Sequence, residues 1–157
     1  MISVHNLHKQ FTVSRGRIAA LRGLAIDIAE GEFFVIVGAS GSGKTTLLRC
    51  VAGLERPDSG AIRIAGRVVS SDDPPTWIPS QERKLGMVFQ SYAVWPHLTV
   101  YENVALPLAE GAHRIPRREV KNRVSEALRL VQLEEFSDRS ATLLSGGSSS
   151  GSPWRGP

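Results

Sequence analysis

One short segment of the chain has the residue types and the spacing of a polyphosphate site. Residues 38–46 fit the pattern G-x-x-x-x-G-K-[ST], in which Gly38 and Gly43 are the glycines, Lys44 is the lysine and Thr45 is the final hydroxyl. Glycine lacks a Cβ and reaches positive φ, so successive main-chain N–H groups can converge on phosphate oxygens. Lys44 can bring a positive charge to the β- and γ-phosphates, and Thr45 can offer its hydroxyl to Mg²⁺. The sequence therefore predicts a site for a nucleotide triphosphate with Mg²⁺.

The segments on either side of the loop are those that such a site requires. Residues 33–37 (FFVIV) are typical of a buried strand, and residues 46–52 (TLLRCVA) of a helix. The N-terminus of that helix would direct its partial positive charge at the same phosphates. A chance Gly/Ser-rich loop is disfavoured because the glycines, lysine and threonine fall in register. The predicted phosphate-binding residues are Gly38, Ala39, Ser40, Gly41, Ser42, Gly43, Lys44, Thr45 and Thr46.

Composition narrows the class of protein. The chain has 157 residues, of which 41% are hydrophobic and 22% are charged, the balance of an ordinary globular domain. No run approaches the roughly 20 apolar residues of a membrane-spanning helix, and the first residues do not resemble a secretory signal. The net charge of +4 permits an anionic partner but does not require one. The basic residues 114–118 contain no aromatic residue, so we expect a solvated helix start and no nucleic-acid partner.

The rest of the chain predicts strands followed by helices. Residues 2–28 read as short strands with a hairpin turn at 14–17, and residues 61–66 and 85–89 read as further strands. Thr99 is expected to cap a helix with Glu102 as its capping-box partner, and Pro107 is expected to limit that helix. A second helix presents one apolar face, made of Val120, Val124, Ala127, Leu128 and Val131.

Two further motifs give the phosphate loop a family context. A predicted strand ends in Gln90, and residues 144–147 read LSGG. Together with the phosphate loop, they resemble the nucleotide-binding subunits of ATP-binding-cassette (ABC) transporters, from residue 1 to about residue 147. The resemblance implies an α/β fold of the P-loop NTPase class. It implies an antiparallel β subdomain, an incomplete parallel core sheet and a helical subdomain at about residues 91–145.

The resemblance assigns roles to residues outside the phosphate loop. Phe11 matches the aromatic residue that stacks on adenine, although core packing is an alternative for this ring. Gln90 matches the glutamine that contacts Mg²⁺ and the attacking water. The signature loop, which closes over the γ-phosphate of ATP held by the other subunit of a head-to-tail homodimer, corresponds to Ser145, Gly146 and Gly147. A serine hydroxyl and glycine N–H groups at a helix start form another anion site.

The resemblance also implies partners and a location. Residues 91–104 (SYAVWPHLTVYENV) are similar to importers of iron(III), polyamines, phosphonates and related organic ions. In such systems this region binds the membrane-spanning permease subunits. Trp95 and Tyr101 are candidate anchor residues there, since aromatic residues dominate interfaces. The alternative for Trp95 is that its side chain packs into the core of the helical subdomain. A periplasmic binding protein belongs to the same kind of system. The expected location is cytoplasmic, peripheral on the inner face of the cell membrane.

The last residues depart from the family pattern. ABC proteins continue the signature with glutamine and a helix, whereas residues 148–157 read SSSGSPWRGP, which opposes a helix. If the three serines are AGC codons, the frame one base earlier can encode QQQRVAVARA. We therefore expect residues 1–147 to be a partial nucleotide-binding domain and residues 148–157 a frameshifted tail, caused by a one-base deletion or a sequencing error. A natural short variant is the alternative, and sequencing the locus distinguishes the two.

The resemblance also predicts which parts of the hydrolytic machinery this chain lacks. No hydrophobic run ending in Asp-Glu, the Walker B pattern, occurs in the 157 residues, and the family's switch histidine also lies beyond the signature. We expect a chain that is poorly soluble or partly unfolded, inactive in hydrolysis and at best a weak nucleotide binder. The alternatives are a non-transport ABC ATPase and a fragment without function. A P-loop kinase or GTPase is disfavoured because neither uses an LSGG motif.

Overall fold

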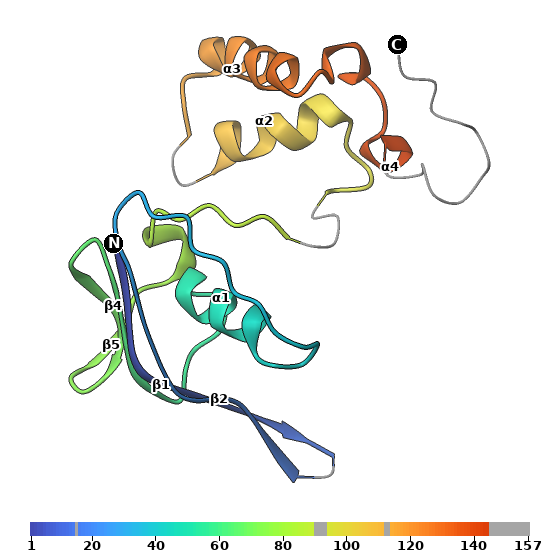
Figure 1. Ribbon diagram of the computed structural model, residues 1–157. Coiled ribbons are helices and arrows are strands. Elements are labelled where there is room, and N and C mark those ends of the chain that lie inside the picture. The colour runs from blue at the N-terminus through green and yellow to red at the C-terminus, as the bar shows by residue number, and fades with distance from the viewer. Residues whose placement is uncertain (15, 90–93, 112–113, 145–157) are drawn as a thin grey trace. The chain divides into compact units, whose positions relative to one another are not determined.

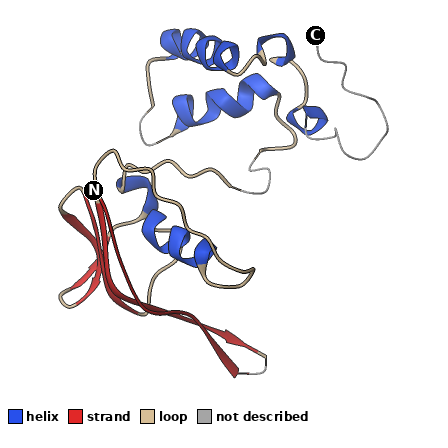
Figure 2. Cartoon of the chain, in the orientation of Figure 1, coloured by secondary structure: helices blue, strands red, loops and turns tan. Residues whose placement is uncertain are grey.

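A computed structural model describes residues 1–14, 16–89, 94–111 and 114–144 (Figure 1). The chain divides into two compact units, Met1–Met87 and Val88–Pro157. The first unit holds all the strands of the described residues and the helix α1, and the second is helical (Figure 2). Each unit is described by itself below.

The first unit is built on a five-stranded sheet with the order β2-β1-β3-β4-β5. Every pair of neighbouring strands is antiparallel, which confirms the expected antiparallel β subdomain. Val13 pairs with Gly16, so the predicted hairpin joins the first two strands. The bounds are β1 Ile2–Val13, β2 Gly16–Ile28, β3 Ser59–Ile64, β4 Arg67–Asp72 and β5 Pro75–Trp77.

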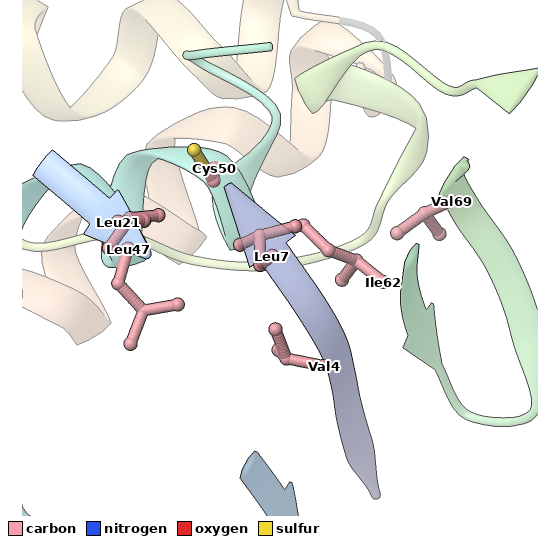
Figure 3. Close-up of a cluster of buried hydrophobic side chains, with 7 residues drawn as sticks. All are labelled: Val4, Leu7, Leu21, Leu47, Cys50, Ile62 and Val69. Carbon is pink, nitrogen blue, oxygen red and sulfur yellow. The ribbon is translucent and has the colours of Figure 1, made fainter. Parts of the chain in front are cut away.

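Helix α1, Lys44–Ala52, covers this sheet and completes its hydrophobic core. Leu47 and Cys50 are the buried residues of α1, and they pack with Leu7 of β1 (Figure 3). The other members of the cluster are Val4, Leu21, Ile62 and Val69. Burial raises the pKa of the Cys50 thiol to about 11, so the thiol is neutral at pH 7 and acts as a small apolar side chain.

Two predicted strands are wrong. Residues 33–37 and 85–89 have no strand conformation, although both are apolar. A strand needs a neighbour to satisfy its main-chain groups, and neither segment has a strand partner among the described residues. Several of their side chains are highly exposed: Phe33 is 92% exposed, Val37 89% and Val88 97%. Ile36, in contrast, is partly buried and packs against the core. Exposed apolar segments favour aggregation, which is consistent with the predicted poor solubility.

The second unit contains the helices α2 (Val100–Glu110), α3 (Arg117–Leu130) and α4 (Ala141–Leu144). Single 3₁₀ turns lie at Ser80–Glu82 in the first unit and at Glu134–Phe136 in the second.

The predicted capping box is present at the start of α2. The Glu102 N–H donates to Thr99 Oγ1 at 3.1 Å, and the Thr99 N–H donates to Glu102 Oε2 at 2.8 Å. Such a cap stabilises a helix by about 1 kcal/mol.

The ends of both long helices differ from the prediction. Pro107 does not stop α2, which continues to Glu110, because a proline near a helix end removes only one hydrogen bond of the ladder. The Pro107 carbonyl still accepts from the Gly111 N–H at 3.2 Å. In α3 the buried residues are Val120, Val124 and Leu128, as expected, but Val131 is 61% exposed because the helix ends at Leu130.

Candidate nucleotide-phosphate site

The phosphate loop is a tight turn that leads directly into α1. The Ser42 N–H donates to the Ala39 carbonyl at 3.2 Å, and the Leu47 N–H donates to the Gly43 carbonyl at 2.9 Å, which is the first bond of the helix. Gly43 is the N-cap with φ of 95°, a conformation that favours glycine. A Cβ on Gly43 would lie 2.4 Å from the Ala20 carbonyl oxygen of β2. The loop can approach the sheet this closely because Gly43 has no side chain.

The Lys44 ammonium is held over the loop by the loop itself. Lys44 Nζ donates to the Gly38 carbonyl at 2.7 Å, to the Ala39 carbonyl at 2.7 Å and to Ser42 Oγ at 3.3 Å. These acceptors are exposed, so a phosphate oxygen can compete for the same donors. The positive charge and the N-terminus of α1 thus belong to one short segment, which favours binding of an anion there.

A hollow lies against this loop. Its volume is about 500 Å³, within the range of small-molecule sites, and it is lined by Ala19, Ala20, Leu21, Arg22, Gly23, Leu24, Ala25, Gly41 and Ser42. The β2 side of this hollow was not predicted from the sequence. Apart from Arg22, the β2 residues that line it are small or apolar, and they form no recognised binding motif.

Of the other predicted site residues, the structure describes some and not others. Thr45 and Thr46 lie in the first turn of α1, with Thr45 exposed. The described residues contain no cluster of three His, Cys, Asp or Glu side chains that could hold a metal. A hydroxyl at the start of α1 is nevertheless a suitable ligand for an ion that shares its shell with phosphate oxygens. The predicted residues Gln90, Ser145, Gly146 and Gly147 lie outside the described residues.

Phe11 lies near the hairpin end of β1, where it pairs with Ile18. Its side chain is 37% exposed and is absent from the buried core cluster, which argues against simple core packing. Lys9 Nζ lies 5.2 Å from the centroid of the ring. Phe11 is not among the described residues that line the hollow, so its role as an adenine platform stays a prediction.

A second candidate surface belongs to the helical unit. A groove of about 650 Å³ is lined by Val94, Trp95, Asn103, Val104, Leu106, Pro107, Glu110 and Gly111. Trp95 is 56% exposed, so the alternative that it packs the core is wrong, whereas Tyr101 packs against the buried core of this unit. The Asn103 side chain bonds both main-chain polar groups of Trp95. Its Oδ1 accepts from the Trp95 N–H at 2.7 Å, and its Nδ2 donates to the Trp95 carbonyl at 3.2 Å.

No helix in the described part of the chain is both long enough and apolar enough to cross a membrane.

The family follows from comparison with known proteins. The sequence pattern of the family described as "ABC transporter" matches residues 10–150. This range includes the phosphate loop and covers most of the chain. The chain therefore belongs to the ABC transporter family, as the LSGG motif and the phosphate loop predicted.

Several curated relatives are subunits of import systems. The chain is 42% identical over 132 residues to the trehalose/maltose import ATP-binding protein MalK of Thermococcus litoralis, covering 84% of this chain and 35% of the relative. It is 45% identical over 139 residues to the spermidine/putrescine import ATP-binding protein PotA of Aggregatibacter actinomycetemcomitans, covering 88% and 35%. The sn-glycerol-3-phosphate import ATP-binding protein UgpC of Rhizobium meliloti is 43% identical over 146 residues, covering 93% and 39%. The chain thus spans little more than a third of the length of these relatives.

Solved structures confirm the fold class. A dimeric post-hydrolysis state of an ATP-binding cassette bound to ADP and Pi is similar with a TM-score of 0.78 and 33% identity, covering 94% of this chain and 64% of that chain. A dimeric bacterial ABC transporter cassette gives a TM-score of 0.79 and 35% identity with the same coverage. The α/β P-loop class is therefore correct for this chain.

Proposed function

We propose that this chain is the nucleotide-binding part of the energy-coupling subunit of an ABC import system. In this proposal the subunit binds MgATP, and the energy of ATP drives a small solute across a membrane. The observation that carries the proposal is the position of Lys44, whose ammonium lies over the phosphate loop at the start of α1. The import function of three relatives supports the transport part.

The remaining site residues have proposed roles in the same reaction. Thr45 and Gln90 contact Mg²⁺, and Gln90 also contacts the attacking water. Phe11 stacks on adenine. In a head-to-tail homodimer, the signature loop of one subunit closes over the γ-phosphate of ATP held by the other, through Ser145, Gly146 and Gly147. The dimeric state of two similar cassettes supports this arrangement.

The groove beside Trp95 is the proposed docking site for the membrane-spanning permease subunits. It is apolar on the Val94, Val104 and Leu106 side and has a large exposed aromatic residue, the kind of surface that dominates interfaces. A periplasmic binding protein completes the proposed system. The proposed location is cytoplasmic, peripheral on the inner face of the cell membrane.

Replacing Trp95 tests the docking proposal. We expect Trp95→Ala to abolish co-purification with a permease encoded beside this gene, since a buried interface tryptophan is worth about 2 kcal/mol or more. The melting temperature should change little because the side chain is 56% exposed. Leu130→Ala is a matched control, since Leu130 is also exposed in this unit but lies outside the groove. Undiminished co-purification of the Trp95 variant would place the interface elsewhere.

Measuring phosphate release tests whether the chain hydrolyses the ATP that it binds. We propose that residues 1–147 bind nucleotide as a partial domain and that residues 148–157 are an aberrant tail. The purified chain should then bind MgATP weakly and release no phosphate beyond background. A chain without water-orienting groups would hydrolyse ATP about 10²–10⁴-fold more slowly from that effect alone. A cooperative melt together with sustained Mg²⁺-dependent phosphate release would contradict this proposal.

A further inference from the structure

A buried arginine lies at the end of α1 that is opposite the phosphate loop. Arg83 is 4% exposed, and its four hydrogen-bond acceptors are all main-chain carbonyls. Nη1 donates to the carbonyls of Cys50 and Val51, at 2.8 and 3.0 Å, in the last turn of α1. A helix leaves its last carbonyls without partners inside the helix, so the guanidinium supplies donors that α1 lacks.

The same side chain joins α1 to the sheet. Nη2 donates to the Val69 carbonyl of β4 at 3.2 Å, and Nε donates to the Ile78 carbonyl at 2.8 Å. The guanidinium carbon lies 4.6 Å from the centroid of the Trp77 ring. Gly53, the C-cap of α1, leaves room for it, because a Cβ there would lie 2.5 Å from Arg83 Nε. One planar group therefore bonds the helix end to two other segments.

The positive charge of Arg83 suits its position at the C-terminal end of α1. Helix C-termini carry a partial negative charge, which a cation stabilises. Burial lowers the pKa of the Arg83 guanidinium, but arginine stays protonated in proteins at neutral pH. Removing the side chain would take one donor from each of the four carbonyls and would remove the charge. The Cys50 and Val69 carbonyls would still accept from the N–H groups of Gly53 and Ile78.

The position of α1 decides where the phosphate-binding N–H groups lie. The helix has nine residues and spans about 13 Å, and it packs on the core through Leu47 and Cys50. The start of α1 also meets β2 at Gly43, so the C-terminal end is the part of the helix that these contacts fix least. A shift of that end tilts the helix and displaces its N-terminal N–H groups. Arg83 holds the C-terminal end, which restricts the tilt.

We propose that Arg83 is a positioning residue for the phosphate loop, which it aligns by fixing the C-terminal end of α1. This inference rests on the proposed function, since it assumes that the loop binds phosphates. Misplacement of binding groups by about 1 Å can cost as much as 100-fold, so we expect at least about a tenfold effect on phosphate affinity.

The test uses the full chain and inorganic tripolyphosphate as the probe, because it contacts the loop without an adenine. Arg83→Met removes every donor, and Arg83→Lys keeps the charge but cannot bond all four carbonyls. We expect the dissociation constant for tripolyphosphate to rise about tenfold or more for Arg83→Met and less for Arg83→Lys. Amide hydrogen exchange at the Leu47 N–H, which bonds to Gly43 at the start of α1, should become faster in both variants.

Two controls separate positioning from loss of stability. Ile62→Val thins the same core without touching the Arg83 acceptors, and Arg67→Lys changes an exposed arginine of β4. All variants are compared well below their melting temperatures, and both controls should keep the parent affinity and the parent exchange rate. If Arg83→Met does not fold, Arg83→Lys carries the comparison.

A lower melting temperature with unchanged affinity and unchanged Leu47 exchange would overturn the proposed role of Arg83. If the parent chain bound no tripolyphosphate, the proposed function would fail instead. The exchange rate at Leu47 would then decide alone whether Arg83 fixes α1: faster exchange in the variants supports it, and equal exchange refutes it.

Discussion

Replacing Lys44 by alanine is expected to weaken MgATP binding by about 100-fold, the largest effect of any single side chain in this site. The ammonium already lies within hydrogen-bond distance of three loop acceptors, so it needs little rearrangement to meet a phosphate oxygen. Bonds from a charged donor to a charged acceptor are about twice as strong as neutral ones. Calorimetric titration of parent and variant measures the change.

Lys121→Ala is the matched control for Lys44→Ala. Lys121 is an exposed lysine of α3, so this variant loses the same charge away from the loop. It should keep the parent affinity, and both variants should keep the parent melting temperature within about 2–4 °C. Equal affinity of the parent and the Lys44 variant on folded material would contradict the assignment of the loop.

Replacing Gly43 by alanine is expected to disrupt both the loop and the fold of the first unit. The new Cβ would lie 2.4 Å from the Ala20 carbonyl oxygen, and the residue has φ of 95°. Overpacking costs about 1–3 kcal/mol and a left-handed conformation costs an alanine about 1–2 kcal/mol, so the variant should lose about 2–5 kcal/mol of unfolding free energy. Chemical denaturation measures this loss, and nucleotide binding should disappear with it.

Gly66→Ala separates backbone strain from the steric clash. Gly66 has φ of 79°, but a Cβ there meets no atom within 4 Å. This variant should lose only about 1–2 kcal/mol, the cost of the left-handed conformation alone, and should retain nucleotide affinity. If Gly43→Ala proved no more destabilising than Gly66→Ala, the close approach of the loop to β2 would not exist in solution.

Features determined by residues close together in the sequence were predictable. The phosphate loop, the β1–β2 hairpin and the Thr99 capping box each depend on residues within a few positions of one another. The identity of Gly43 follows from the motif, although only the structure shows which atom excludes a side chain there. The burial of Val120, Val124 and Leu128 followed from helical spacing in the same way.

Features determined by distant residues were not predictable. Residues 33–37 have the composition of a strand, but a strand also requires a partner, and composition cannot supply one. The β2 wall of the hollow consists mostly of small residues that the fold brings next to Gly41 and Ser42. Arg83 bonds a carbonyl 33 positions away, and its sequence context of charged neighbours gives no sign of burial.

The position of the bound phosphates is the claim on which the rest depends, and amide chemical shifts report it most directly. The chain, labelled with ¹⁵N, would be titrated with MgATP and its main-chain amide signals followed. We predict saturable shifts centred on Gly41, Gly43, Lys44 and Thr45, with the Lys44→Ala variant requiring far more ligand. Folded protein whose loop amides stay unmoved at saturating MgATP, or whose shifts centre on other residues, would contradict the account.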